Sequence, residues 1–511
     1  MYRCTSEYQV YLSPAPKKID NLYTARLERK YLHKKCNRIP KFIKSHYSED
    51  DWKVAPVNHR LENRHLDLGD VSPSNYIHFI SALKANVQGI QADFDDGHCP
   101  TWKNQIFGLY NIYRAVHNQI PNVPKISEAP ILMLRPRAWN MIEHNMSING
   151  KEIPGPLFDF GLLMFHNGFL LSQCESGPFF YLSKLEGAGE AKLWNEIFSW
   201  TQLRLRIPYG TIKACVLIEN ILSSFEMDGI LYELKDHSLG LNCGIWDYAA
   251  SIISKFGDDS SFLLPDRNKY VDIGKPFLKK YIDLVVKTCH KRNAHATGGM
   301  SATLLPNKNS KDFNKIIENV LNNKLTEIQA GIDGFMVYDL KLVKFMNDLW
   351  RKYGGPVSNQ IRFSRESEII TELDLLTLPK GGVTKEGLVH NITVGILFIF
   401  HWLYGKGVFA YNGSVEDSAT AEISRAQIWQ WIRHAAPIEN TDNVVTRSLV
   451  FNETFKVFER LTQNYYDDLA RVKLAVAFNV FLEIVNHRNF PEFITTYLND
   501  TYIFRKMQAN L

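Results

Sequence analysis

The stretch TIKACVLIENILSSFEMDGILYELKDHSLGLNCGIWDY, residues 211–248, decides the fold of the 511-residue chain. It begins with a nearly unbroken apolar run, Ile212–Ile218, that is too short for a helix. A run that is apolar on both faces is typical of a strand inside a buried parallel sheet. A segment with helical periodicity follows, and Leu239–Cys243 then forms a second short apolar strand. This order of strand, helix and strand predicts a βαβ unit.

Two carboxylates follow these two strands. Glu219 comes directly after the first strand and Asp247 just beyond the second, so both are expected at the same carboxyl edge of the sheet. Two carboxylates about 4 Å apart repel each other by roughly 4 kcal/mol at an effective dielectric constant near 20. A bound dication removes this repulsion, and hard oxygen ligands suit Mg²⁺. The alternative is that each acid caps a helix or pairs with an arginine, and the spacing alone leaves both interpretations open.

Composition and charge exclude several classes of protein. The chain is 45% hydrophobic and 12% aromatic, as expected for a globular protein. Its net charge of +5 is mild, and its basic residues are densest between Lys17 and Lys44, where we expect the solvated face of a surface helix. No aromatic-and-basic pattern of a nucleic-acid-binding module accompanies them. The longest apolar run, Ile396–Tyr404, is shorter than the roughly 18 residues that span a bilayer, so no membrane partner is expected.

The seven cysteines have no C-x-x-C spacing. Cys215 and Cys243 lie inside predicted strands, and we expect small core residues of a reducing compartment instead of disulfides or a zinc site. The N-terminus lacks a charged-then-apolar signal, and Ala509–Leu511 shares the form of the peroxisomal S-K-L tripeptide without its basic middle residue.

Eight short apolar segments alternate with helical stretches over roughly 250 residues, which predicts the α/β class and a (β/α)₈ TIM barrel. A doubly wound sheet is the competing architecture, but no G-x-G-x-x-G follows the first strand. The predicted strands are Gln88–Phe94, Ile131–Leu134, Gly161–Phe165, Phe179–Leu182, Ile212–Ile218, Leu239–Cys243, His295–Ala302 and Gly334–Val337.

Charged residues end several of these strands, which is the layout of an active-site face. They are Asp93, Asp95, Asp96, Arg135, Arg137, Lys184, Glu186, Glu219 and Asp247. We expect an N-terminal helical clasp in residues 1–80, the barrel in 81–355 and a C-terminal helical domain in 356–511, where the periodicity is helical. Within that domain Glu416 and Asp417 precede a helix that begins near Ser418, and a carboxylate there complements the helix dipole whatever its function.

Several long motifs in this order resemble the malate synthase family, in its shorter A-type form, over nearly the whole chain after about residue 50. They are RPRAW (135–139), IPGPLFDFGLLMFHN (153–167), GTIKACVLIE (210–219), ILYELKDHSLGLNCGIWDY (230–248), KTCHKRNAHATGGMSA (287–302) and VEDSATAEISRAQIWQWIRH (415–434). The resemblance implies a barrel with an N-terminal clasp and a C-terminal helical plug. It also implies Mg²⁺-dependent condensation of acetyl-CoA with glyoxylate to give malate and CoA in the glyoxylate cycle.

The resemblance assigns roles to residues position by position. Glu219 and Asp247 match the family's magnesium ligands, Arg135 its catalytic arginine and Asp417 its general base. Supporting positions are Asp93, Asp95 and Glu416. Together with the C-terminal tripeptide, the family's habits favour the peroxisome or glyoxysome, with the cytoplasm as the alternative.

The sequence departs from the family pattern at Tyr209, where an arginine is usual, and at Asp339-Leu340, where a His-Pro pair is usual. These departures keep two alternatives open. One is an enzyme for another acyl-CoA or another 2-oxo acid. The other is a catalytically weakened paralogue that serves as a binding protein. The sequence indicates neither the residues that contact acetyl-CoA nor the oligomeric state.

Overall fold

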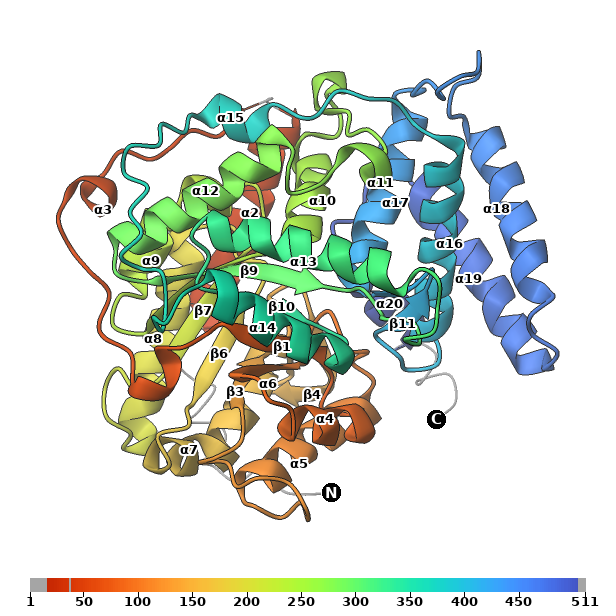
Figure 1. The fold of residues 1–511 in the computed structure, drawn as a ribbon. Coiled ribbons are helices and arrows are strands. Elements are labelled where there is room, and N and C mark those ends of the chain that lie inside the picture. Colours follow the sequence, from red (N-terminus) through yellow and green to blue (C-terminus); the bar gives the residue numbers. More distant parts are fainter. Residues whose placement is uncertain (1–15, 36–37, 504–511) are drawn as a thin grey trace. The chain divides into compact units, whose positions relative to one another are not determined.

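A computed structural model describes residues 16–35 and 38–503 of the chain (Figure 1). These residues divide into two compact units. The first is built mainly from Pro40–Gly244 and Ile282–Ile370, and the second mainly from Ile245–Tyr281 and Thr371–Leu511. The tripeptide Ala509–Leu511, Cys4 and Cys36 lie outside the described residues.

The first unit contains a closed barrel of eight parallel strands, so the predicted (β/α)₈ architecture is confirmed. Around the barrel the strand order is β1-β10-β9-β8-β7-β6-β3-β2. The strands are β1 (Leu66–Val71), β2 (Gly89–Asp93), β3 (Ile131–Arg135), β6 (Phe179–Leu182), β7 (Lys213–Ile218), β8 (Ser238–Cys243), β9 (His295–Ser301) and β10 (Gly334–Val337).

One predicted strand is wrong and one strand was missed. Gly161–Phe165 is helical, because it continues α6 (Gly155–Leu163) into the π-helical turn η2 (Met164–Gly168). Pro156 stands in the first turn of α6, where proline is tolerated, and apolar residues cover most of the helix, which hides its periodicity. The strand that was not predicted is β1, which lies inside residues 1–80, the range predicted as a helical clasp. Its sequence LDLGDV carries two aspartates and a glycine, so it does not resemble an apolar run, although all six residues are buried.

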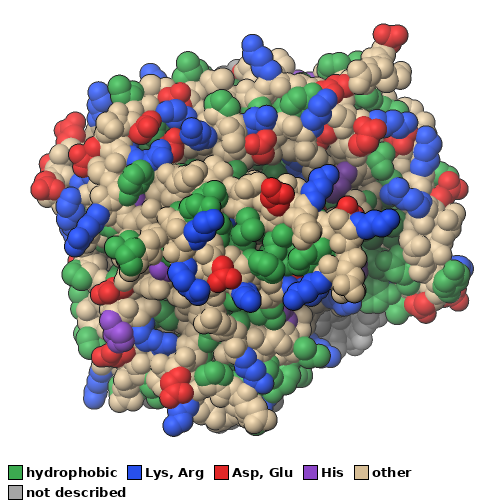
Figure 2. Space-filling view, in the orientation of Figure 1, with side chains coloured by type: hydrophobic (Ala, Val, Ile, Leu, Met, Phe, Trp, Pro, Cys, Tyr) green, Lys and Arg blue, Asp and Glu red, His purple; other side chains and the backbone are tan. Residues whose placement is uncertain are grey.

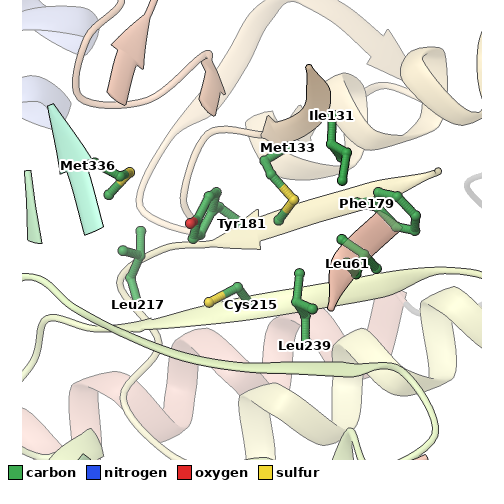
Figure 3. Packing of buried hydrophobic residues seen from close by; sticks show 9 residues of the cluster. All are labelled: Leu61, Ile131, Met133, Phe179, Tyr181, Cys215, Leu217, Leu239 and Met336. Carbon is green, nitrogen blue, oxygen red and sulfur yellow. The ribbon is translucent and has the colours of Figure 1, made fainter. Parts of the chain in front are cut away.

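The barrel interior is filled by side chains from several strands and from the turn η1 (His59–Leu61) (Figure 3). Residues two apart on one strand point inward together, as the period of a strand requires. The cluster consists of Leu61, Ile131, Met133, Phe179, Tyr181, Cys215, Leu217, Leu239 and Met336. Cys215 and Cys243 are buried, as predicted. The interior is therefore packed and leaves the chemistry to the strand ends.

Helices follow most strands of the barrel, and Figure 1 shows α13 (Phe313–Gln329) beside α14 (Val343–Tyr353), which it also contacts. The helical stretches expected between the strands are present, for example as α5 (Trp102–Val116) and α12 (Pro276–Lys291). The helices of at least eight residues with all or part of their length in this unit are α2 (Pro16–Lys35), α4 (Tyr76–Leu83), α5 (Trp102–Val116), α6, α8 (Ala188–Leu205), α12 (Pro276–Lys291), α13 (Phe313–Gln329) and α14 (Val343–Tyr353). Shorter helices are α3 (His46–Glu49), α7 (Phe169–Gln173) and α9 (Met227–Glu233), and β4 (Ile142–Ile148) pairs with β5 (Lys151–Pro154).

The second unit is helical, as predicted for the C-terminal part of the chain. Its long helices α16 (Lys385–Trp402), α17 (Ser418–Arg433) and α19 (Asp468–Asn486) pack on one another, and α10 (Ile245–Phe256) packs on α17. The unit contains α10 (Ile245–Phe256), α11 (Arg267–Tyr270), α15 (Glu372–Leu376), α16 (Lys385–Trp402), α17 (Ser418–Arg433), α18 (Arg447–Thr462), α19 (Asp468–Asn486), α20 (Ile494–Leu498) and the hairpin of β11 (Phe409–Tyr411) with β12 (Ser414–Glu416).

No helix among the described residues is long and apolar enough to cross a membrane. On the face shown in Figure 2, Lys and Arg side chains are interspersed with Asp and Glu side chains and form no continuous basic patch. That distribution agrees with the mild net charge of +5.

Candidate active site

A cluster of acids surrounds one arginine at the carboxyl ends of β2 and β3. Asp93 is the last residue of β2 and Arg135 the last residue of β3, and the parallel register pairs them directly. The Asp93 carboxylate accepts hydrogen bonds from the backbone N–H groups of Asp95 (2.7 Å) and Gly97 (2.8 Å). These bonds fold the chain after β2 into a turn that brings Asp95 and Asp96 back toward Arg135.

Arg135 is 3% exposed and faces five carboxylates. Its Nη1 lies 3.2 Å from Asp93 Oδ2 and 4.0 Å from Asp70 Oδ1, and its Nη2 lies 3.4 Å from Asp95 Oδ2. Nη2 also donates to Asp96 Oδ2 and lies 3.7 Å from Glu219 Oε2. A guanidinium cannot lose its charge in a protein, so Arg135 is a permanent cation at the centre of the acids.

Lys184 supplies a second cation to the same cluster. Its Nζ lies 3.0 Å from Asp95 Oδ2, 2.7 Å from Asp96 Oδ1 and 4.0 Å from Glu219 Oε1. The residue adopts a left-handed backbone conformation with φ 55°, which is uncommon for a side chain of this size. Two hydrogen bonds hold that conformation, because its N–H donates to Glu219 Oε1 (2.7 Å) and its carbonyl accepts from Arg26 of α2 (2.8 Å).

The acids outnumber the two cations, and burial makes their ionised forms costly. Burial raises the pKa of Glu219 to about 7, with Asp96 and Asp95 adding to the rise, although Lys184 and Arg135 oppose it. Burial likewise raises the pKa of Asp93 to about 6, against the effect of Arg135. A further positive charge among these carboxylates would relieve the repulsion.

A metal ion fits this need. Asp96, Glu219 and Asp247 are buried, and each offers a carboxylate oxygen that lies within 4.8 Å of the other two. Asp247 stands in the first turn of α10, which starts two residues after β8 ends. Three hard oxygen donors of net charge −3 suit Mg²⁺, whereas a metal that prefers thiolate ligands would find none in this group.

Arg137, the other arginine of the motif RPRAW, has a structural role. It is buried and pairs with Asp159 through Nε and Nη2 (3.0 and 2.9 Å) and with Glu143 through Nη1 (3.0 Å). Asp159 therefore holds Arg137 in the two-pronged geometry typical of a stable arginine–carboxylate pair.

In the second unit, Asp417 is the N-cap of α17. Its Oδ1 accepts from Thr420 N (2.9 Å), and Thr420 Oγ1 accepts from Asp417 N (3.0 Å), so the two residues form a capping box. The neighbouring Glu416 is 5% exposed and ends β12. The helix-capping role considered for this position is thus present, and it fixes the side chain without excluding a catalytic role.

The structure brings together the predicted site residues Asp93, Asp95, Arg135 and Glu219, and Asp247 joins Glu219 in the group of carboxylates. Two members were noted only as strand-end charges, with no role assigned: Asp96 and Lys184. The signal for Asp96 was present, since it is the third acid after β2. Nothing in the sequence indicated that Lys184 turns back toward Glu219.

Sequence comparisons decide the family. Residues 131–378 match the profile of the malate synthase TIM barrel domain, and residues 382–501 match the malate synthase C-terminal profile. A malate synthase of Myxococcus xanthus is 42% identical over 77% of this chain and 73% of its own length. The chain belongs to the malate synthase family.

Two further malate synthases bear on the type. Malate synthase A of Escherichia coli is 38% identical over 85% of this chain and 84% of its own length. The glyoxysomal malate synthase of Candida tropicalis is 35% identical over 90% of this chain and 86% of its own length. The malate synthase family and its A-type form, inferred from the sequence motifs, are confirmed, and with them the enzyme class.

The two departures from the malate synthase pattern have local explanations. Tyr209 is 61% exposed, and its hydroxyl donates to Asp236 Oδ2 (3.0 Å). Asp339 caps the turn η5 (Leu340–Leu342) by accepting from Lys341 N (2.9 Å), and it also accepts from Leu305 N (2.8 Å). Neither residue contacts a member of the acid cluster through a described hydrogen bond.

Proposed function

We propose that this malate synthase condenses acetyl-CoA with glyoxylate at the carboxyl edge of the barrel, with Mg²⁺ held by Glu219 and Asp247 and with Asp96 beside them. The bound ion would orient glyoxylate and polarise its carbonyl. The observation that carries the proposal is the burial of several carboxylates around two cations, which leaves an excess of negative charge where oxygen ligands converge. Asp93 and Asp95 keep Arg135 in place.

The remaining roles belong to Asp417 and Arg135. Removing a proton from the methyl group of a thioester requires a positioned base and a cation where the enolate charge develops. The Asp417 carboxylate is the proposed base, and Glu416 supports it. Arg135 is the proposed cation, because its charge is permanent and its guanidinium is fixed by carboxylates on both Nη1 and Nη2. Hydrolysis of the thioester then releases CoA.

Release of free thiol from acetyl-CoA tests the proposal. We expect release that depends on both glyoxylate and Mg²⁺, and we expect it to stop when a chelator removes the metal. Release with another acyl-CoA or another 2-oxo acid in place of these substrates would support the alternative substrate. A chain that releases no thiol at any Mg²⁺ concentration would be the weakened paralogue.

Replacement of Asp417 by Asn separates catalysis from helix capping. Asparagine caps a helix about as well as aspartate, so Asp417→Asn should keep the capping box and the stability of the protein. Loss of the base should lower kcat by about 10²- to 10⁴-fold. Turnover is measured by thiol release and stability by thermal unfolding. Near-normal turnover in this variant would show that another group is the base.

For the compartment, the proposal is a peroxisome or glyoxysome. It is supported by relatives that carry the name glyoxysomal malate synthase, such as the Candida tropicalis protein. Fractionation of the native host with peroxisomal and cytosolic marker enzymes tests it. Cofractionation with the cytosolic marker would favour the cytoplasm instead.

A further inference from the structure

Arg267 occupies an unusual position in the second unit. It is the first residue of α11 and is 4% exposed. Its Nη2 donates to Ser424 Oγ of α17 (3.2 Å), and its Nε donates to Asn391 Oδ1 of α16 (3.4 Å). The guanidinium also lies over the ring of Trp246, 5.0 Å from the ring centroid. One side chain thus touches α10, α16 and α17.

The charge of Arg267 lacks a close counter-ion among the described residues. Its one ion-pair contact is with Glu416, whose Oε2 lies 3.9 Å from Nη2, too far for a hydrogen bond. Glu416 Oε2 is itself buried and has no hydrogen-bond partner in the described part of the chain. The Arg267 guanidinium and the Glu416 carboxylate therefore face each other without a direct hydrogen bond between them, although Thr420 also hydrogen-bonds to the Glu416 side chain.

Other buried arginines behave differently. Arg64 donates directly to Asp67, Arg137 to Asp159 and Arg425 to Glu422. A buried cation is tolerated when it has such a partner, and an imperfectly paired one is costly to keep. Arg267 is the exception next to the residue that we propose as the base, which indicates a role other than simple stabilisation.

We propose that Arg267 is a positioning residue for the condensation: its guanidinium fixes the junction of β12 with α17, and its charge keeps the carboxylates of Glu416 and Asp417 ionised. The inference rests on the proposed function of Asp417. Ser424 stands in the second turn of α17, so the bond from Arg267 restrains the same helix that Asp417 caps. The proposed base is then held from two directions.

The electrostatics agree with this geometry. Burial lowers the pKa of Arg267, while Glu416, Asp266 and Asp417 act to raise it. Burial raises the pKa of Glu416, and Arg267 is the largest influence that opposes the rise. Because the interaction is mutual, removal of the Arg267 charge should make the nearby carboxylates harder to ionise. The other titratable group in contact is His390, whose pKa burial and Arg267 lower to about 4.

Arg267 also contacts α10, the helix of the same unit that carries Asp247. Trp246, on which it stacks, is the residue before Asp247 in the first turn of α10. Asp247 is a proposed metal ligand and Asp417 the proposed base. Arg267 therefore links the first turn of α10, which carries Asp247, to the first two turns of α17, which Asp417 caps.

The test is the pH dependence of kcat/KM for thiol release in Arg267→Met and Arg267→Lys. We expect Arg267→Met to move the acidic limb upward by about one pH unit or more and to lower activity at neutral pH at least about tenfold. Arg267→Lys keeps the charge, so its acidic limb should stay near that of the wild type. The matched control is Arg425→Met, which removes another buried arginine, one that belongs to α17 itself, and should leave the limb in place.

Two further variants keep the test decisive. Glu416→Gln removes a like charge beside Asp417, so its acidic limb should move downward, which can be measured even where Arg267→Met does not fold. His390→Gln combined with Arg267→Met should retain the upward shift, because the shift belongs to a carboxylate. An unshifted limb in Arg267→Met, or equal shifts in Arg267→Met and Arg425→Met, would overturn the inference. If the inference on Arg267 fails in this way while Asp417→Asn is inactive, the proposed function still holds, because Asp417→Asn tests the base directly.

Discussion

At the scale of single residues, Arg135 neutralises part of the acid cluster. Because it is buried among five carboxylates, Arg135→Gln leaves those charges uncompensated. Breaking a buried ion pair on one side costs about 3–5 kcal/mol, so the free energy of unfolding should fall by about that amount. Urea unfolding in the absence of metal measures it. The control Arg351→Gln removes an exposed arginine and should change stability by under about 1 kcal/mol. If the free energy of unfolding fell no further in Arg135→Gln than in Arg351→Gln, the charge of Arg135 would not be needed for the stability of the fold.

The raised pKa of Glu219 predicts the pH dependence of the metal-free protein. The folded pKa of about 7 lies above the usual value of 4.5, so the folded state binds the proton more tightly than the unfolded state. Stability from this group is then present below pH 4.5 and is lost as the pH rises through 7, by on the order of 3 kcal/mol. Mg²⁺ binds the ionised form, so its stabilising effect should grow over the same range.

Glu219→Gln supplies the comparison for that prediction. The variant cannot ionise at this position, so its unfolding free energy between pH 5 and 8 should vary less than that of the wild type. Denaturant titrations at several pH values measure the difference. Identical pH profiles for the two proteins would contradict the assignment of the raised pKa to Glu219.

Much of the site at this scale could be predicted from sequence, since charges at the ends of parallel strands meet at one edge. Asp93, Arg135 and Glu219 were found in this way. Lys184 was noted as a strand-end charge but given no role, because its approach to Glu219 depends on a left-handed backbone conformation and on a hydrogen bond from α2. Both depend on tertiary contacts.

At the scale of elements, β1 places an ion pair in the barrel interior. Asp67 of β1 pairs with Arg64, and the Tyr181 hydroxyl lies 2.8 Å from Arg64 Nη2 and 3.3 Å from Asp67 Oδ2. Asp67→Asn should cost about 3–5 kcal/mol, because it leaves the Arg64 cation buried without its counter-ion. Tyr181→Phe should cost only about 1 kcal/mol. Thermal or urea unfolding ranks the two, and an equal cost would contradict an ionic role for this pair.

The same pair explains why β1 was missed from sequence. A barrel strand is normally recognised by a continuous apolar run, and two buried aspartates break that pattern. Asp67 pairs with Arg64, three residues earlier, and with Tyr181 of β6, while Asp70 lies 4.0 Å from Arg135 of β3, and apolar periodicity reveals none of these contacts. The opposite error at Gly161–Phe165 has a related cause, because a fully buried helix and a buried strand are both apolar on all sides.

At the scale of the whole molecule, the compact units do not follow the order of the chain. Residues 245–281 lie inside the predicted barrel range of 81–355, yet they belong to the second unit with α16–α19. The helix that carries Asp247 therefore packs on the helix that Asp417 caps. Sequence periodicity could identify both helices, but their packing depends on contacts between distant segments such as those of Arg267.

Binding of Mg²⁺ to the purified protein tests the central claim, that the buried carboxylates form a metal site. Isothermal titration should show one Mg²⁺ bound by the wild type and an affinity at least about tenfold weaker for Glu219→Gln and for Asp247→Asn. Asp348→Asn, which alters an exposed acid, should bind as the wild type does. Unchanged Mg²⁺ affinity in both site variants, with their folds intact, would contradict the account.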